Sequence, residues 1–290
     1  MPQTIIGKNN ILFLGDDASN ELQIHCNNLN RVSDASLSRY DYNRNKFFII
    51  VFPDKSVYYK NYLPDAYKSI YRPALNVYKS KFNDKLFDAY EVLENLSDAY
   101  YKTDTHINFK GAYSVYLEFI KRVNNIYNLG LIAKQINMSI TNNVELSHLN
   151  RGIGDLTWPL NLGELKLTEP PTDHYYYSED IIEFYIRYKI NTNSNIRFLD
   201  YNLKDNTIKL NDRIVDWNII SEYIIYTTNV NITNKKSIVI FYDSFLVGSL
   251  PLYFELFYKV WFVKSVYDIK LISLINPDFV FEFRVERFLC

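Results

Sequence analysis

The sequence is poor in cysteine and histidine and carries almost no net charge. Its two cysteines, Cys26 and Cys290, have no metal-ligand spacing, and its four histidines form no HxxxH or HxH cluster, so we expect no metal site. With a formal net charge of −1, the chain offers no basic surface for a phosphate backbone. Nucleic acid is therefore excluded as an expected partner.

An export signal and a membrane-spanning run are also missing. The first residues show no basic start followed by a long apolar stretch and a small-residue cleavage site. No segment provides the about 20 apolar residues that a spanning helix needs. The longest candidate, Leu250–Val266, is interrupted by Glu255, Lys259 and Lys264. We expect a cytoplasmic protein without a transmembrane segment.

What the sequence does contain is enough apolar material for a sizeable core. Hydrophobic residues make up 48% of the chain and charged residues 22%, as in ordinary globular proteins, which favours a single domain over residues 1–290. The aromatic fraction is 17%, with 26 tyrosines. Tyrosine surfaces suit carbohydrate and peptide partners, since the ring stacks while the hydroxyl forms hydrogen bonds. The alternative, which explains most of the excess, is an AT-rich genome, because such genomes favour Tyr, Asn, Ile and Lys.

Strand-like and helix-like segments alternate along the chain. Continuous apolar runs predict strands buried on both faces, as in a parallel sheet, and helical spacing in three other segments predicts helices between them. Such alternation is typical of a three-layer α/β fold with a mainly parallel sheet. The predicted strands are Ile11–Leu14, Phe47–Phe52, Ile196–Leu199, Ser237–Tyr242 and Phe279–Phe283, and the predicted helices lie within 86–96, 112–127 and 250–262.

The middle of the chain has a different composition. From about Asn142 to Tyr175 it is polar and contains several glycines and prolines, which indicates long loops. Further on, Asn202–Val215 has the pattern of a β-hairpin around Asn211-Asp212. We therefore expect a loop-rich insertion over roughly 140–235.

The first candidate catalytic residue is Ser244. It follows the predicted strand Ser237–Tyr242 and stands in the run Asp243-Ser244-Phe245, before a predicted helix. Open α/β sheets hold their active sites at the carboxyl ends of strands, where backbone N–H groups can stabilise an oxyanion. The alternative is that Asp243-Ser244 is only a turn or helix-cap signal, and this segment alone favours that alternative.

A second segment, Asp104-Thr105-His106, supplies a possible base for that serine. In an extended segment, residues two apart point the same way, so the Asp104 carboxylate could orient the His106 imidazole. Asp-x-His alone is weak evidence, because a lone loop histidine is usually a surface residue. A serine after a strand together with an Asp–His pair is the constellation of an activated nucleophile.

The two motifs, in this order, resemble the SGNH-hydrolase-like domain of the alginate O-acetyltransferase family. That family has a Tyr-Tyr-x-x-Asp-x-His-(Trp)-x-x-x-Gly-Ala block, matched here by Tyr100–Ala112, and a later Gly-Asp-Ser block. Two departures are Tyr242 in place of the Gly and Ile107 in place of the Trp. Four further short matches occur in family order: Gly7–Leu14, Val51–Tyr58 with its Pro-Asp-Lys, Asp155-Leu156 before Leu162-Gly163, and Asn276–Val280 with Glu286–Leu289.

The resemblance implies an SGNH-like fold and a two-step acetyl transfer. Ser244 would take an acetyl group with His106 as base and Asp104 as its orienting carboxylate, and a sugar hydroxyl of a capsule, O-antigen or similar polysaccharide would accept it. Members of the family are typically exported, which leaves a periplasmic location as the alternative. Without an export signal, acetyl-CoA is the simpler expected donor, and no tightly bound cofactor is expected. Asn229 and Asn234 are candidates for a side-chain oxyanion donor.

Two other functions remain open from the sequence. An esterase that removes acetyl groups from carbohydrate would use the same triad with water as acceptor, and the motifs do not separate the two. A carbohydrate-binding protein on a decayed SGNH fold is supported only by Tyr242 and Ile107. Retention of Asp104, His106 and Ser244 argues against that third possibility.

Overall fold

A computed structural model describes most of the chain outside its middle third. It covers residues 4–15, 18–43, 46–67, 69–102, 104–133 and 156, strand segments 197–199, 207–210, 213–216 and 224–228, and residues 232–247, 249–254 and 256–290. The helices are α1 (Glu21–Cys26), α2 (Asp34–Ser38), α3 (Lys55–Tyr58), α4 (Pro73–Phe82), α5 (Tyr90–Leu93), α6 (Phe109–Tyr127), α8 (Ser244–Val247) and α9 (Ile269–Ile275), with short 3₁₀ turns that include η8 (Leu250–Tyr253) and η9 (Glu286–Phe288).

Within the described part of the chain, seven strands form one sheet in the order β4-β3-β11-β9-β10-β8-β5. The first five run parallel, while β8 and β5 pair antiparallel at one edge. Two separate hairpins are β1–β2 and β6–β7. The strands are β1 (Thr4–Ile6), β2 (Leu12–Leu14), β3 (Phe47–Phe52), β4 (Leu86–Asp88), β5 (Arg197–Leu199), β6 (Thr207–Leu210), β7 (Arg213–Asp216), β8 (Ile224–Thr228), β9 (Ser237–Tyr242), β10 (Lys259–Val263) and β11 (Phe279–Val285).

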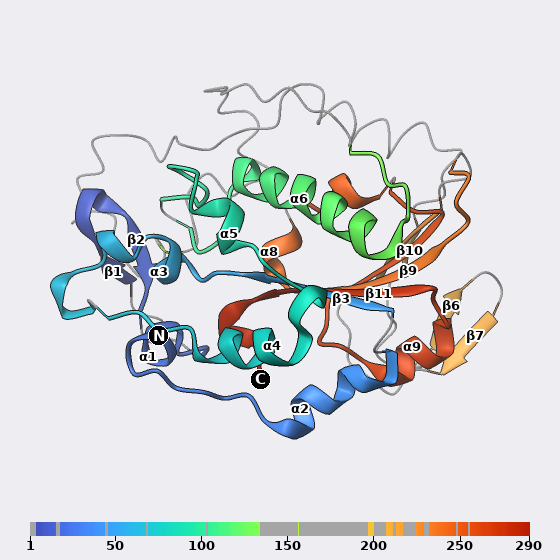
Figure 1. The fold of residues 1–290 in the computed structure, drawn as a ribbon, viewed down its shortest axis with the longest axis horizontal. Coiled ribbons are helices and arrows are strands. Elements are labelled where there is room, and N and C mark those ends of the chain that lie inside the picture. Colours follow the sequence, from blue (N-terminus) through green and yellow to red (C-terminus); the bar gives the residue numbers. More distant parts are fainter. Residues whose placement is uncertain are drawn as a thin grey trace.

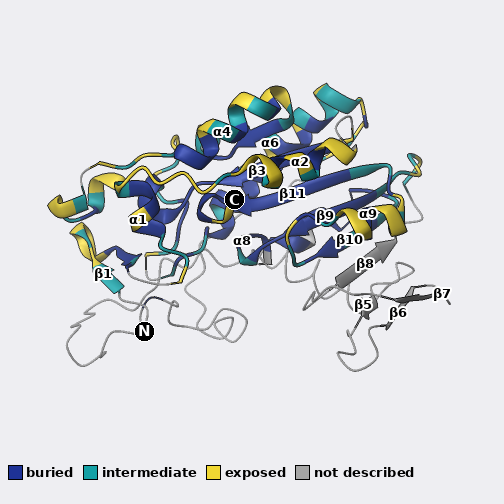
Figure 2. Cartoon of the chain, turned by 90° about the horizontal axis from the view of Figure 1, so that it is seen from below, coloured by how far each residue is buried: buried dark blue, intermediate teal, exposed yellow. Residues whose placement is uncertain are grey.

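Helices cover both faces of this sheet, as Figure 1 shows, with α6 above it and α2, α4 and α9 below. Alternate residues of the central strands contribute to two apolar cores. Phe48, Ile50 and Phe52 of β3 lie in the core under α6, while Phe47, Ile49 and Val51 lie in the core against α4. This burial on both faces explains why β3 is a continuous apolar run, dark throughout in Figure 2.

The predicted α/β class and mainly parallel sheet are confirmed by this topology. The strands predicted at 47–52, 237–242 and 279–283 are present, as is the long helix α6. The hairpin predicted within Asn202–Val215 corresponds to β6 and β7, which pair antiparallel. Most of the predicted insertion lies outside the described residues.

Two helix predictions were wrong, and one predicted strand is present but lies outside the main sheet. The helix expected over 250–262 is instead η8 followed by β10, because Val260, Trp261 and Val263 are β-branched or aromatic and pair between β9 and β8. When a run is apolar at nearly every position, its hydrophobic period does not distinguish a buried helix from a buried strand. The helix expected over 86–96 begins as β4 and becomes the short α5. The run at 11–14 forms β2, paired with β1 outside the main sheet.

Among the described residues, no helix has both the length and the apolar character that crossing a bilayer requires.

Candidate active site

The carboxyl ends of four adjacent parallel strands carry polar residues. From the sheet edge inward these are Asp88 at the end of β4, Asp54-Lys55 after β3, Glu286-Arg287 after β11 and Asp243-Ser244 after β9. Because the strands are parallel, these residues gather at the carboxyl-terminal end of the sheet, where α/β proteins place their active sites. This end of the sheet is therefore the candidate active site.

Ser244 lies at this carboxyl-terminal end of the sheet, at the first position of α8 and directly after Asp243. It is half-buried. Asp243 fixes the turn: Oδ1 accepts the N–H of Phe245 at 2.9 Å, and Oδ2 accepts the N–H of Val285 at 2.7 Å. The carboxylate thus ties the serine turn to the end of β11. A helix was expected only from residue 250 onward, but α8 begins at the serine itself.

The departure at Tyr242 is accommodated without strain. Tyr242 is the last residue of β9 and pairs with Phe283 of β11. No positive φ occurs at this position, so the backbone here does not require glycine. The side chain is 2% exposed and belongs to the core under α6, and burial raises its pKa to about 12. Tyr242 therefore fills the core instead of opening the turn.

Asp104 and His106 lie in a loop closed at its base by a β-bridge between Tyr100 and Ile107. The Asp104 Oδ1 lies 2.6 Å from the His106 Nδ1 and also accepts the His106 backbone N–H at 2.9 Å. Thr105 Oγ1 is 3.2 Å from the same ring nitrogen. The predicted pairing is present, but the geometry is an Asx-type turn and not the extended segment that was expected.

The loop brings the imidazole against the residue that follows Ser244. The ring centroids of His106 and Phe245 are 5.2 Å apart. Phe245 is 2% exposed and also contacts Tyr100 and Phe52, with centroids 6.1 Å apart in each case. The two predicted motifs, which lie far apart in the sequence, therefore meet at one place in the fold.

The helix after the loop holds it from the other side. Asn108 caps α6, its side chain accepting the Gly111 N–H at 2.9 Å. Gly111 allows a close approach: a Cβ there would lie 2.6 Å from the Ala99 carbonyl oxygen and 2.8 Å from Ile107 Cγ1. Ile107, where the family has Trp, is 6% exposed and so belongs to the loop's buried base.

The expected oxyanion donors are placed less favourably. The Phe245 N–H is already donated to Asp243. Asn234 precedes β9, whereas Ser244 follows it, and a six-residue strand is about 20 Å long. The Asn234 amide instead donates to the Leu129 carbonyl at 3.0 Å, so Asn234 is wrong as the side-chain donor. Asn229 lies outside the described residues.

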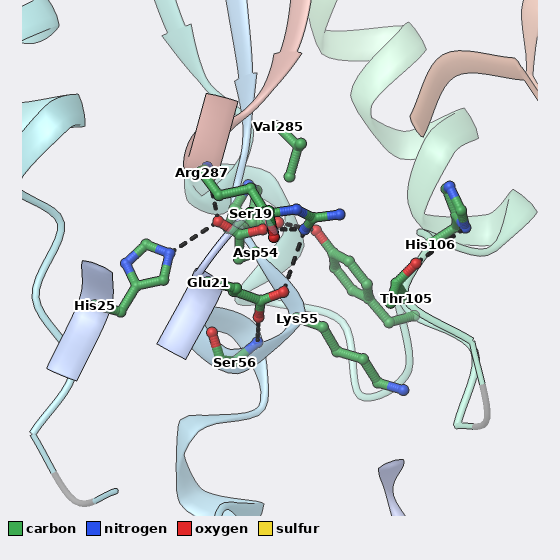
Figure 3. A network of polar contacts seen from close by, with 12 residues as sticks. Ser19, Glu21, His25, Asp54, Lys55, Ser56, Thr105, His106, Val285 and Arg287 are labelled. Atoms are coloured by element: carbon green, nitrogen blue, oxygen red, sulfur yellow. Dashed lines mark hydrogen bonds and ion pairs between the residues drawn. The ribbon is translucent and has the colours of Figure 1, made fainter. Parts of the chain in front are cut away.

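Behind the loop is a buried ionic network of Glu21, His25, Asp54 and Arg287 (Figure 3). Asp54 Oδ2 accepts from His25 Nε2 at 2.8 Å and from the Arg287 N–H at 2.9 Å, while Oδ1 pairs with the Arg287 guanidinium. Arg287 Nη1 also reaches Glu21 at 3.2 Å. The network joins α1, the end of β3 and the end of β11.

Ionisation in this network follows from its charges. Burial alone would lower the pKa of His25, but the hydrogen bond and charge of Asp54, together with Glu286, outweigh it and raise the pKa to about 9. Burial opposes ionisation of Asp54, yet Arg287 and His25 hold its pKa below the ordinary value. Burial raises the pKa of Glu286 to about 7, although Arg72 and His25 oppose the rise. His25 and Asp54 are therefore an ion pair at neutral pH.

Sequence reasoning did not assign a role to His25, Asp54 or Arg287. The available signal was the family resemblance, whose Pro-Asp-Lys block includes Asp54 and whose Glu-Arg ending includes Arg287. Of the third matched block, Leu156 is buried and its carbonyl accepts from Thr4 Oγ1 at 2.7 Å; Asp155, Leu162 and Gly163 lie outside the described residues. Among the residues described, no three His, Cys, Asp or Glu side chains are arranged to hold a metal ion.

No protein-family model and no curated protein matches the chain. Solved structures match it along its length. A DHHW family protein from Eubacterium siraeum has a TM-score of 0.56 at 14% identity, with 99% of this chain and 95% of that chain covered. Bacillus cereus PatB1 gives 0.56 at 16%, covering 100% and 97%. The O-acetyltransferase domain of Pseudomonas putida AlgJ gives 0.53 at 14%, covering 100% and 92%.

These likenesses establish the fold: the chain has the mixed α/β, SGNH-like architecture of PatB1 and AlgJ. PatB1 is also known with a sulfonyl adduct.

Proposed function

We propose that this chain is a serine acyltransferase that moves an acetyl group onto a sugar hydroxyl. The observation that carries the proposal is the contact between the Asp104–His106 pair and Phe245, the residue next to Ser244. A strand-end serine, a histidine packed against the next residue in the chain and a carboxylate on that histidine's Nδ1 supply the three parts of an activated nucleophile.

In the first step, the Ser244 Oγ attacks the acetyl carbonyl carbon of the donor. His106 takes the hydroxyl proton on Nε2, the ring nitrogen opposite the one that Asp104 engages. The tetrahedral intermediate collapses as the bond to the donor breaks, and the imidazolium returns its proton to the leaving group. Asp104 stays ionised, orients the ring and stabilises the imidazolium. With acetyl-CoA as donor, the leaving group is the CoA thiol.

In the second step, the sugar hydroxyl takes the place of the serine hydroxyl. His106 accepts its proton as the oxygen attacks the acetyl-enzyme, and then gives that proton to Ser244 as the serine ester breaks. The product is an O-acetylated sugar, and the enzyme returns to its starting state. Supply of water in place of the sugar would give an esterase by the same steps, so the acceptor decides the class of reaction.

Two lines support transfer and a carbohydrate acceptor. The AlgJ domain of the same fold is an O-acetyltransferase. The resemblance of both motif blocks is to polysaccharide O-acetylating proteins, and the acceptor we propose is a capsule, O-antigen or similar polymer. As donor we propose acetyl-CoA, used in the cytoplasm.

The proposal is tested by following acetylation of the protein and of added sugar. Purified protein is mixed with acetyl-CoA or 4-nitrophenyl acetate, with and without an oligosaccharide acceptor, and peptides are analysed by mass spectrometry. We expect an acetyl group on Ser244 that passes to the sugar and that is absent from Ser244→Ala. Ser249→Ala is the matched control, since Ser249 is 2% exposed and its hydroxyl donates to the Leu246 carbonyl.

The outcomes separate the candidate functions. Acetate release that added sugar does not reduce would establish an esterase instead. A Ser244→Ala variant that keeps most of the wild-type rate would remove the serine mechanism altogether.

A further inference from the structure

We propose that Lys55 is a positioning residue of this site: its ammonium group fixes the loop that carries Asp104 and His106. The inference rests on the proposed function, because the loop is of interest only if His106 acts on Ser244. Lys55 is the first residue of α3 and comes just after the carboxyl end of β3.

The contacts of Lys55 are to the backbone of that loop. Nζ donates to the carbonyl of Lys102 at 2.8 Å and to the carbonyl of Asp104 at 2.9 Å. The Lys102 carbonyl also accepts the N–H of Leu12 at 2.9 Å, so β2 and Lys55 hold the same point. Asp104 is thereby fixed twice, through its carbonyl by Lys55 and through its carboxylate by His106.

Burial makes this arrangement informative. Lys55 is 1% exposed, whereas lysine is almost never fully buried without a partner. An ammonium hydrogen bond to a carbonyl is charge-assisted and stronger than a neutral one, especially away from water. An apolar side chain would fill the space at lower desolvation cost but would leave two loop carbonyls without this donor. A lysine whose burial carries a desolvation cost therefore stands where its ammonium group contacts the loop.

Both chain neighbours of Lys55 are themselves held by hydrogen bonds (Figure 3). The preceding Asp54 is bonded to His25 and Arg287, and the following Ser56 donates its N–H to Glu21 at 3.1 Å. A second tie joins the same segment to the loop, because the Tyr100 hydroxyl donates to the Pro53 carbonyl.

This chain of contacts relates the histidine loop to the serine turn. Arg287 follows β11, and the end of β11 is bonded to Asp243, beside Ser244. The path from Ser244 to His106 therefore runs through Asp243, β11, Arg287, Asp54 and Lys55. Small displacements matter here, since misplacing reacting groups by about 1 Å can cost on the order of 10²-fold in rate.

The test uses phenylmethanesulfonyl fluoride, which needs neither donor nor acceptor. The Ser244 oxygen forms a bond to sulfur, the S–F bond breaks, His106 takes the serine proton and fluoride leaves. We expect Lys55→Met to slow sulfonylation of Ser244 by about 10²-fold, with Lys55→Arg and Lys55→Gln in between because each can still donate to a carbonyl. Lys110→Met is the control, since Lys110 pairs with the Asp98 carboxylate at 2.5 Å beside the same loop.

A second readout separates positioning from a loss of fold. In protein labelled with ¹⁵N-histidine, the Nδ1–H of His106 held by Asp104 and the Nε2–H of His25 held by Asp54 should give two downfield proton resonances. Lys55→Met should broaden or shift the His106 resonance while the His25 resonance stays, and Lys55→Arg should restore it. Should Lys55→Met not fold, the Lys55→Gln variant is measured in the same way.

The outcomes are distinguishable from failure of the proposed function. Wild-type protein that is never sulfonylated at Ser244 would overturn the proposed function, and the His106 resonance then decides the role of Lys55 alone. Wild-type protein that reacts, together with a folded Lys55 variant that reacts within about threefold and keeps the His106 resonance unchanged, would overturn the positioning role.

Discussion

The molecule contains two histidine–carboxylate pairs in contrasting surroundings. His25 and Asp54 have side chains that are 0% exposed and form part of the buried ionic network. His106 and Asp104 are 30% and 23% exposed and lie in a loop beside the serine turn. The two N···O distances are similar, at 2.8 Å and 2.6 Å. The same pair of residue types thus occurs once in a buried ionic network and once in the proposed active site.

What distinguishes them is the set of partners of each ring. His25 has acceptors on both nitrogens, the Tyr71 carbonyl at 2.7 Å from Nδ1 and Asp54 on Nε2. Both nitrogens must then carry protons, which agrees with the raised pKa and leaves the ring unable to act as a base. In the other pair, the carboxylate engages Nδ1 of a ring that packs against the neighbour of a serine. Partner geometry, rather than the pair itself, indicates which one can do chemistry.

The largest effect that would sharpen this contrast is on acylation of Ser244. His106→Ala should slow acetylation or sulfonylation by about 10²–10⁴-fold, the usual contribution of general-base assistance. Asp104→Asn should cost a similar factor, because the ring loses its orienting carboxylate. The double variant should be hardly slower than His106→Ala, since the two groups act as one unit. Single-turnover rates measured by mass spectrometry would establish this.

The free energy of unfolding, in contrast, should hardly change in the His106 and Asp104 variants. Partly exposed ion pairs contribute only about 0–1 kcal/mol, so both variants should unfold in urea close to the wild type. Silence of both substitutions in the acylation assay would make the Asp-x-His match accidental. A silent Asp104→Asn with an inactive His106→Ala would show that another carboxylate orients the ring. Asp243 is a poor substitute, because both of its oxygens accept backbone N–H groups.

The second largest effect is on folding, at the buried pair. Asp54→Asn leaves Arg287 and His25 without their shared carboxylate, and removing one partner of a buried ion pair costs about 3–5 kcal/mol. We expect a loss of that size in the free energy of unfolding from urea titrations. A change below about 1 kcal/mol would show that Asp54 is no more important to the fold than an exposed residue, and the contrast between the pairs would disappear.

The exposed pair could be predicted from the sequence, whereas the buried one could not, for a physical reason. Asp104 and His106 are two residues apart, so their contact is local and a short motif is sufficient to indicate it. Asp54 meets His25 across 29 residues and Arg287 across 233, through pairings that depend on the order of the sheet strands. No local pattern encodes such an order.

The same reasoning applies to the elements. Ser244 was placed at a strand end because β9 is a bounded apolar run with a polar residue after it. The segment after it was assigned as a helix because it is apolar on every side, and only its pairing with β8 and β9 makes Lys259–Val263 a strand. Lys55 shows why the site could not be predicted completely from sequence. The positioning role that we propose for it depends on contacts with a loop about 50 residues away.

The smallest effect concerns how the stability of the buried pair depends on pH. The folded pKa of His25 is about 9, above the ordinary value of 6.5 that applies to the unfolded chain. A raised folded pKa means that the folded state binds the proton more tightly, so this stabilisation is complete below pH 6.5 and is lost as the pH rises to about 9. At about 1.4 kcal/mol per pKa unit, the loss is at most about 3.5 kcal/mol.

This pH dependence can be assigned to His25 with one variant. Glu286, with a pKa of about 7, loses its own contribution between pH 4.5 and 7, and burial also raises the pKa of Glu21. The loss between pH 7 and 9 is therefore assigned to the histidine by comparison with a His25 variant. Unfolding free energies from urea titrations should fall over that interval in the wild type and change much less in His25→Gln. Because Gln can still donate to Asp54 but cannot carry the charge, it separates the hydrogen bond from the proton. Equal slopes in the two proteins would mean that His25 is neutral when folded, and the buried pair would then differ from the exposed one only in its solvent exposure.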